Sequence, residues 1–574
     1  MEVFMFRNPS AKQVIKIAIG VLIATLISFL LFYVMLPPLN PYSRSFWFFM
    51  TLVLAIYGIS IAFFHSIGNQ NRTEYAPQGT SVGKKRKSPF TLIKEKRVGR
   101  IYAIIVLLPI VVIIIGSLFS STIFNANSYA NVIQVKEEDF ASDMPEADEV
   151  KNIALLDTES ARILGTRKLG ALANVVSQYV VSNNYTQINY QGQPVKVANL
   201  EYDGFFKWLN NRDTGIPGYI MVDAVGNSAE YQELERNMIY SESAYFSKDL
   251  ERALRFRYPT KIFDNISFEV DETGKVYYIV SCASPKVGLF GAMDISEVII
   301  FDPVDGSSER YDVDKVPTWV DIVYEGYLAC EKYDWKGLYS GGYWNSIIGQ
   351  KDCKQTTDDF GYLMLDDDVW YVTGVTSVTA DESNIGFILS CARTGEYKFY
   401  PVIGAEEYSA MGAAEGEVQE KGYDASFPAL VNVAGEPTYI MVLKDASKLV
   451  KLYALVNVEQ YNIVATGETQ AAARAEYIKL LAQSGIDMPD INTPDINTGN
   501  EVEITLQEIQ YLPMNGTTKV YLTAEDGTIF SLDFNEDNEG ILFAHVGSRL
   551  KVSATLNEKS GIMVVYAWEI LPEE

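Results

Sequence analysis

Three long apolar runs near the N-terminus constrain the fold of this chain more than any other feature. The runs are Ile15–Leu36, Phe46–Phe64 and Ile101–Phe119, and together they hold a single charged residue, Lys16. At 1.5 Å per residue, about 20 residues cross the roughly 30 Å hydrocarbon layer of a bilayer. A packed core helix would keep a polar face, which these runs lack. We therefore expect residues 1–120 to form three transmembrane helices, at 15–36, 46–64 and 101–119.

The distribution of basic residues predicts how these helices are oriented. Arg7 and Lys12 precede the first run and Lys16 lies at its start, nine basic residues lie in the loop 65–100, and only Arg44 lies between the first two runs. Loops rich in Lys and Arg stay on the cytoplasmic side. The first run is also too long for a cleaved signal segment. We expect a multi-pass protein of the cell membrane, with the N-terminus and loop 65–100 cytoplasmic and residues 120–574 extracytoplasmic.

The net charge of the chain differs sharply between the anchor and the rest. Residues 1–119 contain 13 Lys or Arg and 3 Asp or Glu, whereas residues 120–574 contain 34 and 70. An outer part with a net charge of −36 repels nucleic-acid phosphate. The expected partners are therefore the lipid bilayer and an envelope protein or cell-wall partner, with no nucleic acid. The sequence leaves open whether the chain forms an oligomer.

Beyond the anchor, the sequence predicts a multi-module α+β ectodomain built from antiparallel sheets. Three strand–turn–strand units centre on Asp271–Gly274, Asp302–Gly306 and Arg393–Gly395, where Gly supplies the positive φ that a tight turn needs. We expect strands at Asn174–Ser182 and helices at Ser243–Arg257 and Glu468–Gln483. The predicted parts are an acidic stalk at 121–150, α+β modules at 151–330 and 331–484, a linker at 485–500 and a small β-barrel at 501–574.

The linker and the barrel follow from two features of the C-terminal sequence. The pentapeptide Pro-Asp-Ile-Asn-Thr occurs twice in succession from Pro489 and shows no apolar periodicity. Closely spaced strands follow, including Gly540–His545, and predict a small closed barrel that is OB-like or SH3-like.

Residues suited to catalysis are scarce. Of the two histidines, His65 directly follows the second apolar run at its cytoplasmic end and His545 lies in the barrel, so no His-based triad or zinc site is expected in the main ectodomain. Carboxylate pairs at Asp366–Asp368 and Glu406–Glu407 suit general acid–base chemistry, but 70 acidic residues produce such pairs by chance. Asp533–Asp537 begins like a calcium loop and then loses its pattern. We expect no catalytic residue, no metal site and no cofactor, and the binding residues stay unknown.

Four cysteines and a group of aromatic residues complete the candidates. Cys282, Cys330, Cys353 and Cys391 all lie in the exported part, and the sequence leaves open whether they form disulfides, with Cys330 and Cys353 the first pair to test. The Gly-rich aromatic stretch Trp335–Trp344 predicts an ordered loop. Its rings would serve either core packing or the binding of a sugar or peptide.

At Phe256–Asn265, Asp368–Ser377 and Gly404–Met411, the chain resembles a group of multi-pass membrane proteins of Firmicutes with a large exported domain. Members sometimes carry names from the colicin V production family or from Tat signals, and the resemblance implies no particular activity. The turn Asp271–Gly274 and the helix at Glu468 also resemble PepSY domains, which implies exported modules that restrain peptidases or bind envelope partners.

These observations favour a non-enzymatic, membrane-anchored extracytoplasmic binding or scaffold protein of the bacterial envelope. The competing hypothesis is an extracytoplasmic carboxylate hydrolase acting on envelope glycans, for which Glu407 is the first residue to test. Two inward-facing carboxylates in an acidic cleft would favour the hydrolase.

Overall fold

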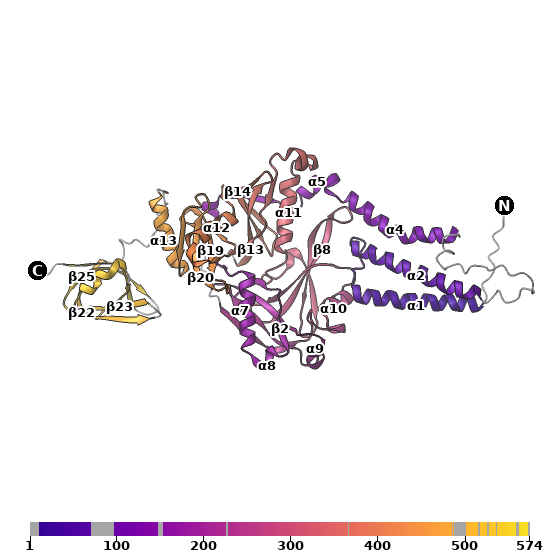
Figure 1. Ribbon diagram of the computed structural model, residues 1–574, viewed down its shortest axis with the longest axis horizontal. Coiled ribbons are helices and arrows are strands. Elements are labelled where there is room, and N and C mark those ends of the chain that lie inside the picture. The colour runs from indigo at the N-terminus through magenta and orange to yellow at the C-terminus, as the bar shows by residue number, and fades with distance from the viewer. Residues whose placement is uncertain are drawn as a thin grey trace, which may run out of the picture. The chain divides into compact units, whose positions relative to one another are not determined.

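The computed structural model describes residues 11–70, 97–146, 153–225, 228–365, 367–484, 486, 501–514, 517–524, 527–534, 536–557 and 562–571. The chain divides into two compact units, Met1–Ile486 and Asp487–Glu574. The first unit is α+β and its sheets are built mainly from antiparallel pairs, as the sequence predicts (Figure 1).

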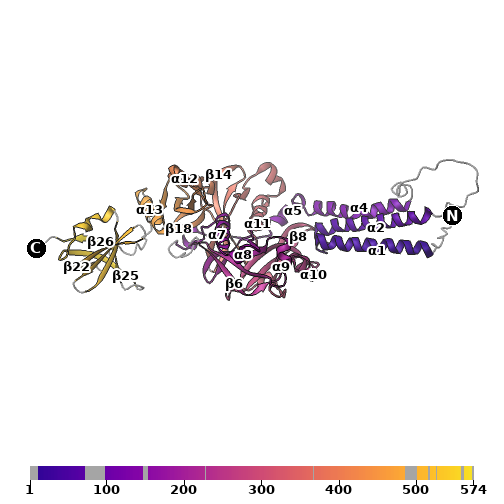
Figure 2. The same cartoon turned by 60° about the horizontal axis from the view of Figure 1, so that its bottom comes forward.

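The N-terminal apolar runs form three helices, α1 (Ala11–Met35), α2 (Arg44–Gln70) and α4 (Arg97–Phe119). Two segments, Val14–Met35 and Ile101–Phe119, are long and apolar enough to cross a membrane, and the apolar part of α2, Arg44–Ser60, is shorter. Figures 1 and 2 both show the three helices side by side. Residues 71–96 of the predicted basic loop lie outside the described residues.

Hydrogen bonds join α2 to both neighbouring helices. The hydroxyls of Thr25 and Tyr57 are 2.8 Å apart, and Ser60 Oγ donates to the Gly20 carbonyl at 2.6 Å. On the other side, the Tyr102 hydroxyl donates to the Leu54 carbonyl of α2. The three helices therefore form one packed bundle with α2 between α1 and α4.

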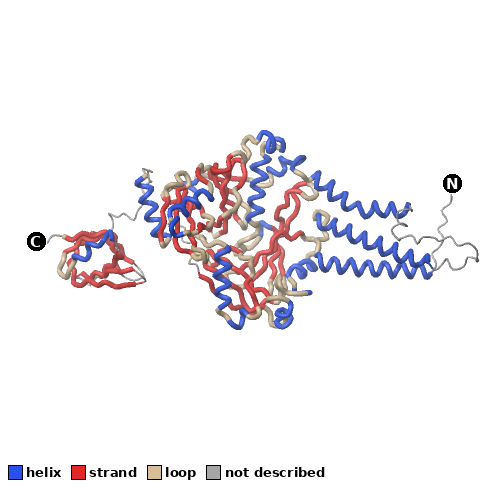
Figure 3. Tube along the Cα trace, in the orientation of Figure 1, coloured by secondary structure: helices blue, strands red, loops and turns tan. Residues whose placement is uncertain are grey.

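The first two sheets of the first unit share one hydrophobic core. The first sheet has the order β2-β4-β5-β6, with β3 paired to β4, and the second has the order β10-β9-β8-β7. Helix α7 (Thr158–Gly170) lies against the first sheet (Figure 3). The strands are β2 (Tyr179–Val181), β3 (Thr186–Tyr190), β4 (Gln193–Tyr202), β5 (Ile216–Asp223), β6 (Ser228–Met238), β7 (Ile262–Val270), β8 (Val276–Val287), β9 (Gly291–Phe301) and β10 (Ser308–Asp312).

The third and fourth sheets share a second core. The third has the order β1-β15-β14-β13-β11, with β12 on β13 and β16 on β14; the fourth has the order β17-β19-β20-β21, with β18 on β19. The strands are β1 (Val135–Glu137), β11 (Lys354–Thr356), β12 (Gly361–Leu365), β13 (Asp368–Ser377), β14 (Ala380–Cys391), β15 (Tyr397–Tyr400), β16 (Gly404–Ala405), β17 (Asp424–Ala425), β18 (Ala429–Val433), β19 (Glu436–Lys444), β20 (Val450–Asn457) and β21 (Val464–Gly467).

Short helices connect and cover these sheets. Among the described residues of the first unit, the other α-helices are α5 (Thr122–Ala130), α6 (Phe140–Asp143), α8 (Ala173–Val176), α9 (Phe205–Asn211), α10 (Leu250–Arg257), α11 (Gly326–Tyr339), α12 (Glu407–Glu417) and α13 (Gln470–Gln483). The three predicted hairpins are confirmed as the antiparallel pairs β7–β8, β9–β10 and β14–β15. The two predicted helices are confirmed with later starts, as α10 and α13.

The predicted acidic stalk is wrong over its described residues, 121–146. This segment forms α5, β1 and α6, and β1 pairs in parallel with β15. The Phe140 side chain is buried, and Asp143 accepts hydrogen bonds from Lys398 at 2.8 Å and from the Tyr400 hydroxyl at 2.5 Å. Acidic composition alone suggested a solvated stalk, but acidic side chains such as Asp143 form hydrogen bonds and ion pairs within the domain.

Other local predictions were also wrong. The proposed module boundary at 330/331 falls inside α11, and the first half of the predicted loop Trp335–Trp344 belongs to the same helix. Trp335 and Tyr339 are four residues apart, and their rings lie 5.2 and 6.4 Å from that of Tyr129, so helical spacing directs both toward one partner. The predicted strand at 174–182 is helix α8 followed by the short β2.

In the second unit, strands close into a barrel in the order β22-β23-β24-β26-β25. Its pairs are antiparallel except β24 with β26, which is parallel. The predicted strand Gly540–His545 is wrong, because a 3₁₀ helix covers Glu536–Phe543. Most of the predicted linker 485–500 lies outside the described residues. The strands are β22 (Glu501–Met514), β23 (Thr517–Ala524), β24 (Ile529–Phe534), β25 (Arg549–Asn557) and β26 (Ile562–Ile570).

Candidate functional site

A cavity of about 620 Å³ lies where all four sheets of the first unit meet. Its walls come from the start of α7, from β3 and β4, from β7, from the start of α11, and from β12, β13 and the edge of β18. The lining residues are 154–158, Arg162, 183–187, Lys196, 265–267, Ile322, 325–327, 359–362, Tyr371 and 427–429. A volume of this size is typical of sites for small ligands.

Two polar side chains, Gln187 and Lys196, form a buried pair in the wall of this cavity. They are direct register partners on β3 and β4, so their side chains leave the same face of the sheet. Each residue is only 2% exposed. Among the described residues, neither the amide nitrogen nor the amide oxygen of Gln187 has a hydrogen-bond partner. Leaving such a group unsatisfied costs about 1–3 kcal/mol, so the site is suited to a polar ligand or to water.

The Lys196 ammonium lies 4.5 Å from the centroid of the Tyr362 ring. Burial lowers the pKa of Lys196 to about 8, although the negative charge of Asp157 opposes this. The amine is therefore mostly protonated at neutral pH while being costly to keep charged. A buried group with a perturbed pKa in a cavity is a candidate functional residue.

Carboxylates lie around the same cavity and are partly engaged by backbone groups. Glu325 caps α11 by accepting from Tyr327 N at 3.0 Å, and Asp359 accepts from Phe360 N at 2.8 Å. Burial raises the pKa of both carboxyls. At Asp157 burial acts in the same direction, but hydrogen bonds from Lys444 and Ser160 outweigh it and lower the pKa.

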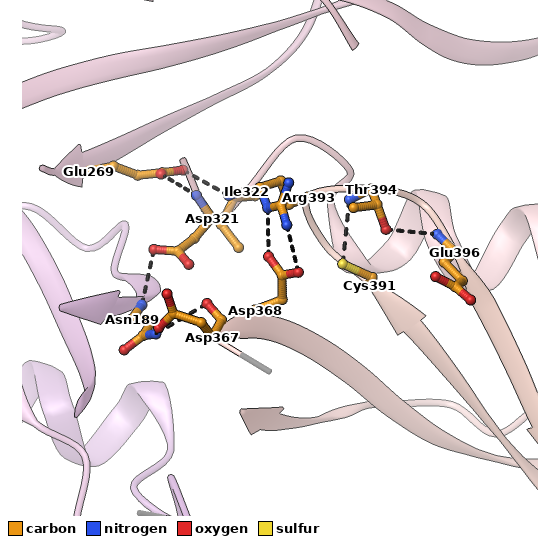
Figure 4. Close-up of polar contacts among 10 residues, drawn as sticks. All are labelled: Asn189, Glu269, Asp321, Ile322, Asp367, Asp368, Cys391, Arg393, Thr394 and Glu396. Atoms are coloured by element: carbon orange, nitrogen blue, oxygen red, sulfur yellow. Dashed lines mark hydrogen bonds and ion pairs between the residues drawn. The ribbon is translucent and has the colours of Figure 1, made fainter. Parts of the chain in front are cut away.

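A buried carboxylate cluster, drawn in Figure 4, adjoins the cavity through its hydrogen bonds to the lining residues Ser267 and Ile322. Glu269 of β7 accepts hydrogen bonds from Asp321 N at 2.8 Å, Ile322 N at 3.1 Å and the Ser267 hydroxyl at 3.0 Å. Ser267 and Ile322 themselves line the cavity. The Asp321 carboxylate accepts from Asn189 N at 3.0 Å, which links the second sheet to β3 of the first.

This cluster continues into the third sheet. The Asn189 amide donates to the carbonyl of Asp367 at 3.1 Å and to its carboxylate, and Asp368 forms a two-pronged ion pair with Arg393 at 2.6 and 2.7 Å. Burial raises the pKa of Glu269 to about 7. Burial and the nearby Glu269 charge raise the pKa of Asp321 well above its ordinary value. The cluster therefore ties three sheets together through buried carboxylates.

The carboxylates singled out from sequence occupy two different places in the fold, the start of β13 and the start of α12. Asp366 lies outside the described residues, and Asp368 is bound to Arg393. Glu407 is buried at the start of α12 and accepts from Gly374 N at 2.5 Å, while Glu406 occupies the position just before that helix. Burial raises the pKa of Glu407. Asp368, Glu406 and Glu407 do not line the cavity.

Other sequence candidates also lie away from the cavity. All four cysteines are free thiols, so the suggested pair of Cys330 and Cys353 is not joined. Asp533 belongs to β24 of the barrel, and its neighbour 535 lies outside the described residues. No cluster of three or more His, Cys, Asp or Glu suited to a metal occurs in the part of the chain that the structure describes.

Sequence reasoning did not single out Gln187, Lys196, Glu269 or Asp321. One signal was present, because Lys196 interrupts the apolar strand Val195–Leu200, where a charged residue facing the core is unusual. The partners of these residues come from distant segments, which no local pattern reveals.

Comparisons with known proteins add little to these observations. No protein-family model matches the chain, and no curated protein matches it. Among solved structures, an ancestral GH74 enzyme matches with 11% identity and a TM-score of 0.14, over 62% of this chain and 42% of that chain. A similarity this weak does not inform the fold or the function.

Proposed function

We propose that the chain is a membrane-anchored extracytoplasmic binding protein of the bacterial cell envelope that does not act as an enzyme. The single observation that supports this most strongly is the buried Gln187–Lys196 pair facing the cavity. Its unsatisfied amide and its charged amine are costly for folding alone and useful for holding a polar ligand. The ligand would be a peptide or glycan portion of an envelope protein or of the cell wall.

The chemistry of the cavity supports this ligand class. Aromatic side chains, including Phe360, Tyr362 and Phe427, offer faces for stacking on sugar rings or apolar side chains. The amide of Gln187 can both donate to and accept from a peptide or acetamido group. Glu325 and Asp359 favour a ligand with amino or hydroxyl groups at their end of the cavity.

We propose that α1, α2 and α4 all span the membrane. Interhelical hydrogen bonds on both sides of α2 support a three-helix bundle, because polar contacts of this kind stabilise helices within lipid. The loop charges favour a cytoplasmic N-terminus and an extracytoplasmic ectodomain. The resemblance to Firmicutes membrane proteins and to PepSY modules stays a prediction.

We further propose that the C-terminal barrel is OB-like and serves as an adaptor. In chain order its strands run 1-2-3-5-4, and the third and fifth are parallel. That parallel pair favours an OB-like barrel over an SH3-like one, and the acidity of the exported part disfavours a nucleic-acid ligand.

A hydrolase acting on envelope glycans is the second candidate. It is favoured by Glu325 and Asp359, whose raised pKa values would suit general acid catalysis. Release of product from cell-wall fragments by the full chain, lost in both Glu325→Gln and Asp359→Asn, would support it.

Site-specific crosslinking in intact cells tests the binding proposal. A photoreactive residue at Tyr327, which lines the cavity and is 65% exposed, should capture an envelope component. The matched control is Tyr461, which is 54% exposed and does not line the cavity. We expect the Tyr327 adduct alone to disappear when Gln187→Leu is added. The same adducts at both positions, or insensitivity to Gln187→Leu, would refute the proposal.

A further inference from the structure

An exposed aromatic surface lies beside the outer end of α1. We define the α9–α10 surface by Phe206, Tyr245, Phe246 and Phe256, of which Phe206 is 76% exposed, Phe246 57% and Phe256 47%. Beneath it, Trp208 packs against the rings of Tyr245 and Phe246 at 5.3 and 5.7 Å. Several large exposed aromatic side chains on one firm base mark an interaction surface.

One guanidinium connects this surface directly to the anchor. Arg252 donates to the Phe246 carbonyl at 2.8 Å and to the Tyr33 carbonyl of α1 at 3.3 Å. Its guanidinium carbon also lies 4.4 Å from the centroid of the Tyr33 ring. The Arg252 side chain thus bridges Phe246 and α1 directly. Figures 1 and 2 both show α10 beside the end of that helix.

Further contacts hold the segment after α10 and the end of α1 in the same relative orientation. Leu39 N donates to the Pro259 carbonyl at 2.6 Å, and the Asn40 amide donates to the Thr260 carbonyl at 2.8 Å. The Phe256 ring packs edge-on against Phe32 of α1, with centroids 5.6 Å apart. Backbone and side-chain contacts thus hold the surface against the last turn of α1.

The place along α1 where the α9–α10 surface makes contact identifies the partner of that surface. The apolar segment Val14–Met35 has 22 residues, which corresponds to about 33 Å of helix and therefore to the roughly 30 Å hydrocarbon layer. Tyr33, near its outer end, marks the boundary between acyl chains and headgroups, where aromatic side chains are enriched. A surface held next to Tyr33 meets the outer leaflet at that depth.

The backbone at Phe246 supports an outward role for its ring. Its φ is +55°, a conformation that bulky residues rarely adopt. The result is an exposed ring at a site where the neighbouring Tyr245 and Trp208 already form a packed cluster. Strain that exposes an apolar side chain fits an interaction made outside the protein.

We propose that the α9–α10 surface rests in the interfacial layer of the outer leaflet, so that lipid is its partner and the ectodomain is held at a fixed tilt. The proposal rests on the membrane-spanning role proposed for α1. It adds a contact between bilayer and ectodomain that anchoring by helices alone does not require.

Spin-label depth measurements test this proposal on the full chain in phosphatidylcholine–phosphatidylglycerol nanodiscs. Labels are placed through Phe246→Cys and Phe206→Cys, with Tyr461→Cys as the aqueous control and Leu30→Cys, 61% exposed in α1, as the lipid control. The unsubstituted chain serves as the labelling blank for the four native thiols. Collision with oxygen, which is enriched in lipid, is compared with collision with a water-soluble nickel complex.

We expect the oxygen-to-nickel ratio at positions 206 and 246 to be severalfold higher than at 461, and lower than at 30. If the ratio at positions 206 and 246 equals that at 461 while the label at position 30 lies in lipid, the proposal is overturned and the membrane-spanning role of α1 still holds. A water-exposed label at position 30 would instead overturn the anchor itself. Two surface positions are used so that a folding defect in one variant does not decide the result.

Discussion

Replacing Lys196 by Met should stabilise the chain while removing a ligand-binding group. Methionine keeps the apolar stem that packs near Tyr362 but lacks the buried charge. Burial lowers the pKa of Lys196 from 10.5 to about 8, and at ~1.4 kcal/mol per pH unit the charged amine costs the fold roughly 3 kcal/mol. The lost ammonium–ring attraction offsets about 0.5–2 kcal/mol of that gain. We expect a net gain in unfolding free energy of about 1–3 kcal/mol at pH 7.

The pH dependence of this gain follows from the sign of the pKa change. Between pH 8 and 10.5 the unfolded chain still binds the lysine proton while the folded chain has released it. Wild-type stability therefore rises across that window through this residue, and the advantage of Lys196→Met should shrink until it disappears near pH 10.5. Both variants share every other titrating group, so those contributions cancel in the difference.

The assay is unfolding of the full chain in nanodiscs, followed by tryptophan fluorescence at pH 7 and pH 10.5. The matched control is Lys332→Met, because Lys332 is equally buried but forms a 2.6 Å ion pair with Asp294. Its removal leaves a buried carboxylate poorly paired and should cost about 3–5 kcal/mol. Destabilisation by Lys196→Met at pH 7, or a gain that does not shrink toward pH 10.5, would refute the reasoning.

Three further predictions follow from the buried groups. Because the folded chain holds the Glu269 proton up to about pH 7, the contribution of Glu269 to stability should fall as pH rises from about 4.5 to 7; Glu269→Gln should remove that contribution from the pH dependence measured in denaturant titrations, and an unchanged pH dependence would contradict the assignment. Asp143→Ala removes the part-buried ion pair with Lys398 and should lower the free energy of unfolding by about 1–3 kcal/mol in the same assay. If the segment were a free stalk, the same substitution would have no effect. Burial raises the pKa of the thiols of Cys282 and Cys330 to about 12, so mass spectrometry should find them alkylated only after unfolding; a disulfide found by non-reducing mapping would count against four free thiols.

Local sequence predicted those elements whose stabilising contacts lie close along the chain. The hairpins at Asp271–Gly274 and Arg393–Gly395 follow from a glycine with positive φ, 85° and 70°, between two apolar segments. Helix α13 follows from a run of strong helix formers, and it begins just after the cap residue Thr469. In each case a few neighbouring residues supply both the turn or cap and the pattern.

Predictions from local sequence were wrong where the structure depends on contacts between distant segments. The segment 121–146 was predicted to be a stalk from its acidity, yet β1 is held by a strand 262 residues further along, as the pairing of Val135 with Tyr397 shows. The stretch predicted as a loop from Trp335 begins within α11, where Trp335 packs against Tyr129 and the Leu338 carbonyl contacts Cys353, and both partners come from other segments. Composition records neither kind of contact.

The sequence by itself determined the apolar N-terminal helices, the antiparallel α+β character and the scarcity of histidine, because each depends on composition or on short periodicities. Only the tertiary structure decided the candidate site. Gln187 and Lys196 lie on adjacent strands, but Tyr362 and the cavity walls come from segments up to 275 residues apart, 154 to 429. Burial creates the unsatisfied amide and lowers the lysine pKa, and burial is a property of the assembled sheets.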